Sequence, residues 1–210
     1  MYRKLIFASI FMAVLALASA PVQADTIGGP SCGSCFGNTY TLTFTSEGTN
    51  LFDITLTIDT SASTQVGNFL NAAAFKIVSS SSDILSITDV SVPTGFNTTP
   101  VLGGLSAGGC ATGPEGFVCF PFVGTTGVAL PDGTLVFNAD VLVSAGTLLT
   151  GDLASSVKAL FVDSTGKQTG LTSEDITLQP GTSVPEPSSL MLLGTGLLGL
   201  AGFARRKFAS

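Results

Sequence analysis

Strict alternation of apolar and polar side chains in two neighbouring segments limits what this chain can fold into. Between residues 39 and 45, Tyr40, Leu42 and Phe44 alternate with four threonines. Between residues 52 and 59, four apolar side chains alternate with threonine and aspartate. Because successive side chains of a β-strand point to opposite faces, each segment has one apolar face for a core and one polar face for solvent. The pattern predicts two half-buried strands.

The same period recurs along the middle of the chain, and turn-forming clusters separate the runs. The later runs cover residues 72–78, 85–92, 117–122, 135–143, 157–161 and 176–179. About eight strands of this kind predict an all-β fold, an antiparallel β-sandwich of jelly-roll or immunoglobulin/cohesin-like type. A β-solenoid is the alternative, but no repeat of fixed period is present. We expect the glycine-rich stretch 102–116 to be a long loop and a candidate functional surface.

The N-terminus is apolar in a sequence with few charges. Only 10% of the 210 residues are charged, against about 25% in typical soluble domains. Arg3 and Lys4 precede an apolar run over residues 5–18, and small side chains follow it up to Ala24. This order predicts a signal peptide over residues 1–24, cut after Ala24. An uncleaved membrane anchor is the alternative, although the run is short for a span of about 20 residues.

The C-terminal segment arranges similar parts in a different order. Pro185, Glu186 and Pro187 precede an uncharged stretch over residues 188–204. A basic cluster then follows, consisting of Arg205, Arg206 and Lys207. As a helix the uncharged stretch would measure about 25 Å, slightly less than the roughly 30 Å hydrocarbon core. We expect one transmembrane helix over 188–204, with the basic cluster on the cytoplasmic side.

These C-terminal residues resemble the PEP-CTERM sorting signal of exopolysaccharide-producing Gram-negative bacteria. The resemblance covers residues 184–210 and the signal peptide. It implies export through the Sec translocon, cleavage by signal peptidase, and an intermediate anchored in the inner membrane with a periplasmic domain. It also implies that an exosortase, a transpeptidase-like membrane enzyme, cuts near residues 185–187 and transfers the protein to the cell surface or extracellular matrix. A plain membrane anchor is the alternative.

The segment between these ends, residues 25–183, is expected to be the exported domain, and it is strongly acidic. It has three lysines, no arginine and thirteen acidic residues, a net charge of −10. Because phosphate binding requires clustered basic side chains, this composition argues against nucleic acid as a partner. The chain has no histidine, which removes the commonest general base and the Ser-His-Asp triad. Asp53 and Asp59 share a strand face but lie about 20 Å apart, too far for a glycosidase pair.

Four cysteines lie in the expected exported domain: Cys32, Cys35, Cys110 and Cys119. An even number in an oxidising compartment predicts disulfides, and three connectivities are open. We expect the local pairing, Cys32 with Cys35 and Cys110 with Cys119. One alternative is a thioredoxin-like redox pair at residues 32–35, which would have to begin a helix. The other is a four-cysteine zinc site, which the wide spacing of Cys110 and Cys119 disfavours.

Two further kinds of binding site have weak signals. Asp163 and the pair Glu174-Asp175 could contribute to Ca²⁺ binding in loops, but the spaced acids of an EF-hand loop are absent. Sugar sites often use exposed aromatic rings, whereas the domain has no Trp and a single Tyr, Tyr40, on an apolar face. We therefore expect no catalytic, metal or cofactor-binding residues.

The sequence thus predicts an exported surface or extracellular-matrix protein with a non-enzymatic structural or adhesive role. Exopolysaccharide or other matrix components are its candidate partners. A module that binds polysaccharide or another surface protein is the first alternative. A secreted hydrolase that works without histidine is the second.

Overall fold

The computed structural model describes residues 22–28, 32–148 and 155–176. These ranges belong to one compact unit that ends at Gln179. They contain twelve β-strands and one short 3₁₀ helix, η2 (Ser81–Asp83). In the described ranges no helix has the length and apolar composition needed to cross a membrane. The predicted span 188–204 and most of the predicted signal peptide lie outside these ranges.

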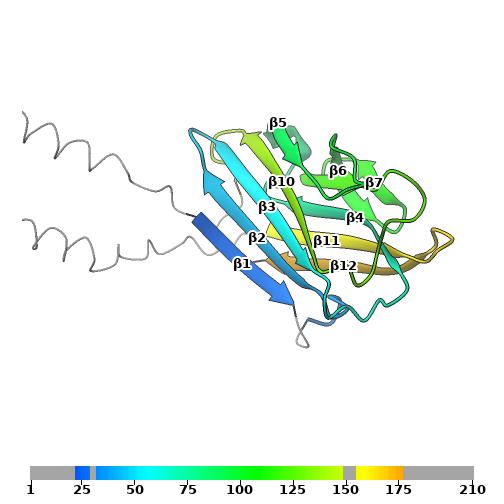
Figure 1. Ribbon diagram of the computed structural model, residues 1–210. Helices are drawn as coiled ribbons and strands as arrows, with labels where there is room; N and C mark the ends of the chain where they lie inside the picture. Colours follow the sequence, from blue (N-terminus) through cyan, green and yellow to red (C-terminus); the bar gives the residue numbers. More distant parts are fainter. Residues whose placement is uncertain (1–21, 29–31, 149–154, 177–210) are drawn as a thin grey trace, which may run out of the picture. The chain divides into compact units, whose positions relative to one another are not determined.

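The strands form two antiparallel sheets, which confirms the predicted all-β class (Figure 1). The first sheet has the order β1-β2-β3-β10-β5, with β1 (Val22–Gly28), β2 (Thr39–Ser46), β3 (Leu51–Asp59), β10 (Thr134–Val143) and β5 (Ile84–Ser91). The second has the order β12-β11-β4-β8-β6-β7, and β9 also pairs with β4. Its strands are β12 (Gln168–Ile176), β11 (Ser155–Val162), β4 (Phe69–Lys76), β8 (Phe117–Pro121), β6 (Val101–Ser106), β7 (Gly109–Thr112) and β9 (Val128–Ala129).

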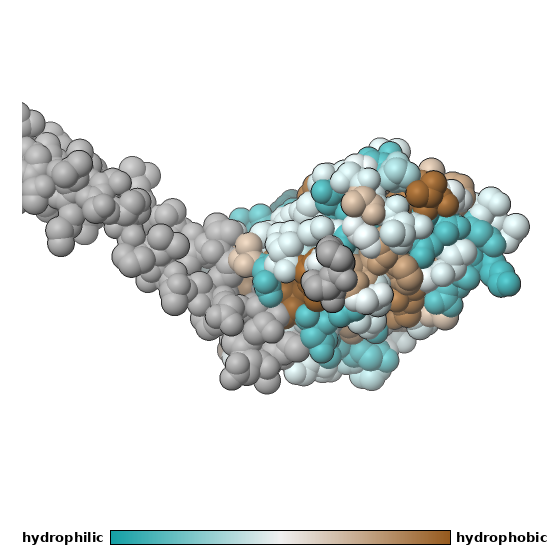
Figure 2. Space-filling model, turned by 90° about the horizontal axis from the view of Figure 1, so that it is seen from below, coloured by the Kyte–Doolittle hydropathy of each residue, from teal (hydrophilic) through white to brown (hydrophobic). Residues whose placement is uncertain are grey.

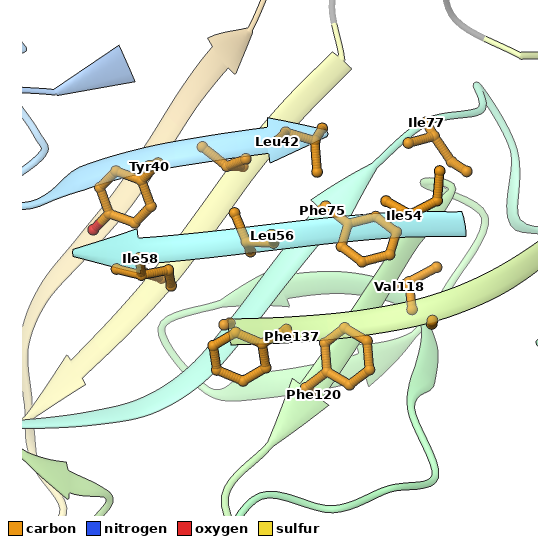
Figure 3. Packing of buried hydrophobic residues seen from close by; sticks show 14 of the residues in the cluster. Tyr40, Leu42, Ile54, Leu56, Ile58, Phe75, Ile77, Val118, Phe120 and Phe137 are labelled. Atoms are coloured by element: carbon orange, nitrogen blue, oxygen red, sulfur yellow. The ribbon is translucent and has the colours of Figure 1, made fainter. Parts of the chain in front are cut away.

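The apolar faces of the two sheets share one hydrophobic core (Figure 3). On β2 and β3 the predicted alternation holds, because every second side chain from Tyr40 to Phe44 and from Ile54 to Ile58 is buried, while Phe52 is partly buried. The ring of Phe137 on β10 lies with its centroid 5.6 Å from that of Phe120 on β8, so the contact joins the two sheets. The ring of Phe96 packs edge-on against Phe137 from the connection between β5 and β6, with centroids 4.9 Å apart.

The second sheet also buries part of its other face. A second apolar cluster on this outer face contains Ala72, Ala74, Leu105, Phe117, Cys119, Leu160 and Val162. Strand β6 contacts β11 across this face, although β4 and β8 lie between them in the sheet order. The sheet therefore curves back on itself. Alanines at 72 and 74 leave room for this close approach, because their side chains end at Cβ.

Two predictions for this domain were wrong or incomplete, because glycine and threonine in the strands concerned hide the alternation of polar and apolar residues. The predicted long loop 102–116 instead contains the hairpin of β6 and β7. Its glycines have no side chain, so the stretch shows no alternation of polarity. Of the run predicted at 176–179 only Ile176 is described, and it is the last residue of β12, which begins at Gln168. Strand β12 turns Gly170 and Thr172 inward, so it too lacks an apolar alternation.

Strand β1 runs across the predicted signal-peptide cleavage site. Its residues Val22, Gln23 and Ala24 pair with Thr45, Phe44 and Thr43 of β2. A cut after Ala24 would leave Asp25–Gly28 as the paired remainder of this edge strand.

Neighbouring residues of β10 provide a matched test of the core. Phe137 is fully buried, whereas Val136 is 45% exposed. We expect Phe137→Ala to lower the free energy of unfolding by about 3–5 kcal/mol, through lost burial and the cavity it leaves. Val136→Ala should cost less than about 1 kcal/mol. Urea denaturation of the mature protein measures both, and equal losses would contradict the assignment of faces.

Candidate functional site

The hairpin of β6 and β7 forms one wall of an open cleft, and β11 contributes Lys158 to it. The cleft has a volume of about 210 Å³. Its polar side chains are those of Ser106, Thr112, Glu115 and Lys158. The glycine-rich stretch predicted as a candidate functional surface contains the first three of these residues. Lys158, far away in sequence, is not among the predicted site residues.

Two of the three lysines of the acidic domain meet at one aromatic ring in this region. The ammonium nitrogen of Lys158 lies 4.5 Å from the centroid of Phe117, and that of Lys76 lies 5.7 Å from it. Lys158 also donates a hydrogen bond to the carbonyl oxygen of Leu105, at 3.3 Å. The ring is almost completely buried, so it cannot be a flat platform for a sugar. Its contacts with the two ammonium groups help to hold the lysines in place. The two cations come from β4 and β11, far apart in sequence, and no local pattern could have paired them.

The cleft wall is held by a disulfide and by close backbone packing. Cys110 on β7 is bonded to Cys119 on β8. Gly103 on β6 has a positive φ of 149°, and a Cβ there would collide with the backbone of Gly113 and Ala111. Only glycine allows this approach. The hairpin therefore has little freedom to move away from the sheet.

The second disulfide, between Cys32 and Cys35, gives the local pairing predicted for all four cysteines. Its turn connects β1 to β2 and leads into a strand, so it lacks the helix start that a thioredoxin-like pair requires. The Ser34 hydroxyl donates to Glu174, and Ser34 O accepts from Thr172 at 2.8 Å. Because both partners lie on β12, the turn ties the edges of the two sheets together.

The loop acids proposed for Ca²⁺ are not brought together. Asp163 accepts hydrogen bonds from Thr165 and Lys167 within its own turn. These bonds hold the pKa of its carboxyl below the usual range, the Thr165 side chain contributing most. Glu174 and Asp175 lie at the opposite end of the β11–β12 hairpin. Glu174 accepts a hydrogen bond from Ser34 and Asp175 accepts one from Ser156, so the three carboxylates have separate partners.

The acids on the outer face of the first sheet are arranged differently from the sequence expectation. Asp53 lies directly opposite Asp140 on β10. Carboxylate oxygens of Asp53, Asp140 and Glu47 lie within 4.8 Å of one another. Burial, followed by the neighbouring charges of Glu47, Asp53 and Asp89, raises the pKa of Asp140. The exposed Asp59 is separate, and hydrogen bonds from Ser61 lower its pKa.

The C-terminal segment gives a match to a known family model. Residues 183–207 match the PEP-CTERM protein-sorting motif. The chain is therefore a protein that carries a C-terminal sorting signal, and the signal is of the PEP-CTERM type. This signal implies Sec-dependent export, a membrane-anchored form and processing by an exosortase. The recognition made from Pro185, Glu186, Pro187 and the basic cluster is confirmed, although these residues lie outside the described ranges.

Other comparisons add little. None of the curated proteins matches the chain. A solved structure described as "pH-induced modulation of Streptococcus parasanguinis adhesion by Fap1 fimbriae" is 13% identical, with a TM-score of 0.38. The alignment covers 79% of this chain and 94% of that chain. A likeness this low carries no argument about fold or function.

The disulfide beside the cleft can be tested by replacing both of its cysteines. Cys110→Ser with Cys119→Ser should lower the free energy of unfolding by roughly 2–3 kcal/mol on the chain-entropy account. Hydrogen exchange should accelerate in β6 and β7 more than in β2 and β3. The matched control replaces Cys32 and Cys35 with Ser and should leave exchange in the β6–β7 hairpin unchanged. Uniform acceleration in the first double variant would show that the bond does not act locally.

Because the phenol of Tyr40 is buried, we expect the folded protein to lose stability at high pH. Burial raises the pKa of this phenol from 10.0 to about 12, and hydrogen bonds with Thr172 and Asn38 oppose this rise. The folded protein therefore holds this proton between pH 10 and pH 12 while the unfolded chain releases it. Stability present below pH 10 is lost as the pH rises toward 12. Tyr40→Phe should flatten this part of the stability profile.

The titration can be followed at one site. Residues 25–183 contain no other tyrosine, so the absorbance of tyrosinate in the folded mature protein reports Tyr40 alone. Ionisation near pH 10 without unfolding would contradict the buried position.

Proposed function

We propose that the β domain acts as a non-enzymatic structural or adhesive component at the surface or in the extracellular matrix of a Gram-negative bacterium. The observation that carries this proposal is the PEP-CTERM sorting motif at residues 183–207. A sorting signal of this kind serves a protein whose place of action is outside the inner membrane. The attached domain is consistent with that destination, because both of its disulfides suit an oxidising compartment.

The proposed route uses both ends of the chain. Residues 1–24 direct the chain to the Sec translocon, and signal peptidase cuts after Ala24. Residues 188–204 then span the inner membrane, with the basic cluster 205–207 inside the cell. Pro185 and Pro187 resist helix formation and keep the chain extended at the membrane surface. An exosortase reads this extended motif, cuts near it and releases the domain for surface attachment.

The surface of the domain suits a protein that must remain soluble while held at high local density. Threonine hydroxyls cover much of the outer face of the first sheet, and those of Thr26 and Thr41 lie 2.9 Å apart. In Figure 2 much of the visible described surface is pale, the colour of residues near the middle of the hydropathy scale. Net charge of −10 in residues 25–183 keeps neighbouring copies apart and away from anionic lipid.

A binding module for polysaccharide or another surface protein is the second candidate function. The cleft of about 210 Å³ beside Lys158 favours it. The cleft combines an ammonium, a carboxylate and two hydroxyls with a wall that a disulfide restrains. Such restraint is useful to a binding site, because little ordering is needed when a ligand enters.

The hydrolase alternative has one specific observation in its favour. Asp53 faces Asp140, and burial raises the pKa of Asp140. Two neighbouring carboxyl groups, one of them with a raised pKa, are what a general acid and its partner require. Against it, Asn138 donates to Asp53, and the pair lies on the outer face of the sheet. Turnover of a generic glycoside that is lost in Asp140→Asn would revive this alternative.

The sorting proposal predicts a trapped intermediate. Replacing Pro185, Glu186 and Pro187 together with Ala removes the extended motif and leaves the apolar stretch and the basic cluster intact. We expect an uncut form to accumulate in the inner membrane, while the wild-type protein accumulates outside it. Cell fractionation and intact mass of the recovered protein measure both outcomes.

A matched control changes one residue of the β domain instead. Val136→Ala leaves the C-terminal segment unaltered, and its processing should equal that of the wild type. If the wild-type protein keeps its complete C-terminus in a host that contains the exosortase, residues 188–204 are a permanent anchor and the sorting proposal fails.

A further inference from the structure

We propose that the cleft beside Lys158 binds a carboxylated sugar unit, such as a uronic acid of an acidic polysaccharide. The inference rests on the proposed function only in assuming that the domain meets polysaccharide outside the cell. Its chemistry comes from the residues that line the cleft.

Lys158 provides the anion-binding group, and its position is fixed. A lysine ammonium has three N–H donors. One is directed to the carbonyl oxygen of Leu105 at 3.3 Å, and the nitrogen also lies 4.5 Å from the centroid of the Phe117 ring. Donor capacity therefore remains for a ligand in the cleft that Lys158 lines. Since both contacts already order the side chain, a ligand carboxylate pays less of the usual entropy cost.

The other polar groups select what accompanies the carboxylate. Glu115 lines the same cleft, and its carboxylate repels a second negative charge while accepting hydrogen bonds from hydroxyls. The hydroxyls of Ser106 and Thr112 can both donate and accept. A dianion such as phosphate is disfavoured by Glu115. A single carboxylate next to several hydroxyls, as in a uronic acid, complements the set.

The size of the cleft limits the ligand to one unit. Its volume of about 210 Å³ is below the roughly 300–1,000 Å³ of pockets that enclose drug-sized molecules. Because the cleft is open to solvent, the rest of a polysaccharide can continue outside it. We expect a dissociation constant in the millimolar range for one unit, and tighter binding by many copies on one polymer.

The test uses mature protein recovered from the host, labelled with ¹⁵N and titrated with D-glucuronate, D-glucose, inorganic phosphate or L-alanine. Glucuronate should shift the amide resonances of β6 and β7. Glucose has no carboxylate for Lys158, and Glu115 repels the second charge of phosphate. Both should therefore bind at least about tenfold more weakly. Alanine, a zwitterion without hydroxyls, should also bind more weakly.

Two variants and one control assign the residues. Lys158→Gln should weaken glucuronate binding at least about tenfold. The control, Lys167→Gln, removes the same charge from an exposed turn and should keep wild-type affinity. Glu115→Gln keeps an acceptor but removes the repulsion, so phosphate should now shift the same resonances. This gain decides the proposal even if Lys158→Gln fails to fold.

The proposal is overturned if glucuronate shifts no resonance of β6 or β7 in the folded protein. It is equally overturned if alanine or phosphate binds as tightly, or if Lys167→Gln loses as much affinity as Lys158→Gln. Fractionation of the host separates this failure from that of the proposed function. Protein that reaches the surface without binding glucuronate refutes the cleft alone, whereas binding by protein that stays in the inner membrane refutes the surface role alone.

Discussion

Strand β8 is buried on both faces, and this constraint connects the core to the candidate site. One face carries Phe120, whose ring meets Phe137 across the main core. The other carries Phe117 and Cys119, which belong to the second apolar cluster. A strand covered on both sides cannot shift register by one residue without exchanging the two sets of side chains. The packing of the sheets therefore also places the ring on which Lys76 and Lys158 converge.

The curvature of the second sheet follows from small side chains at the right positions. Ala72 and Ala74 lie on the face that β6 approaches. Larger residues there would prevent β6 from reaching the Lys158 ammonium, which now bonds to the carbonyl of Leu105. The cleft is thus a product of the curved sheet and does not depend on a long flexible loop. Loops carry most binding sites, and here a disulfide-linked hairpin takes that place.

The parts of the molecule that could be predicted from the sequence are those whose residue pattern lies within one continuous segment. Strands β2, β3 and β10 alternate apolar and polar residues, so their positions and buried faces were predictable. The PEP-CTERM signal is contiguous, so Pro185, Glu186 and Pro187 identified it without a structure. Strands β6, β7 and β12 present glycine or threonine where alternation needs an apolar residue. Strands β6, β7 and most of β12 were missed because they are strands only through pairing with their neighbours. The sequence of one segment does not show that pairing.

The candidate sites were hidden for the same physical reason. Asp53 shares a strand face with Asp59, about 20 Å away, whereas Asp140 lies directly opposite Asp53 on the neighbouring strand. Lys76 and Lys158 are separated by about half of the domain in sequence, and the sheet order brings them to one ring. Sequence spacing measures distance within a strand, whereas sites on a sheet form across strands.

The acidity of the domain and its lysine cleft act over different distances. At physiological salt the electrostatic interaction of exposed charges is screened beyond about 8 Å. The net charge therefore governs how copies of the domain and anionic surfaces repel one another, whereas a bound carboxylate responds to the charges next to it. Glu115 and Lys158 both line the cleft. The carboxylate of Glu115 discriminates against a doubly charged ligand, and the ammonium beside it holds a singly charged one. The local pair, and not the total charge, sets the ligand chemistry.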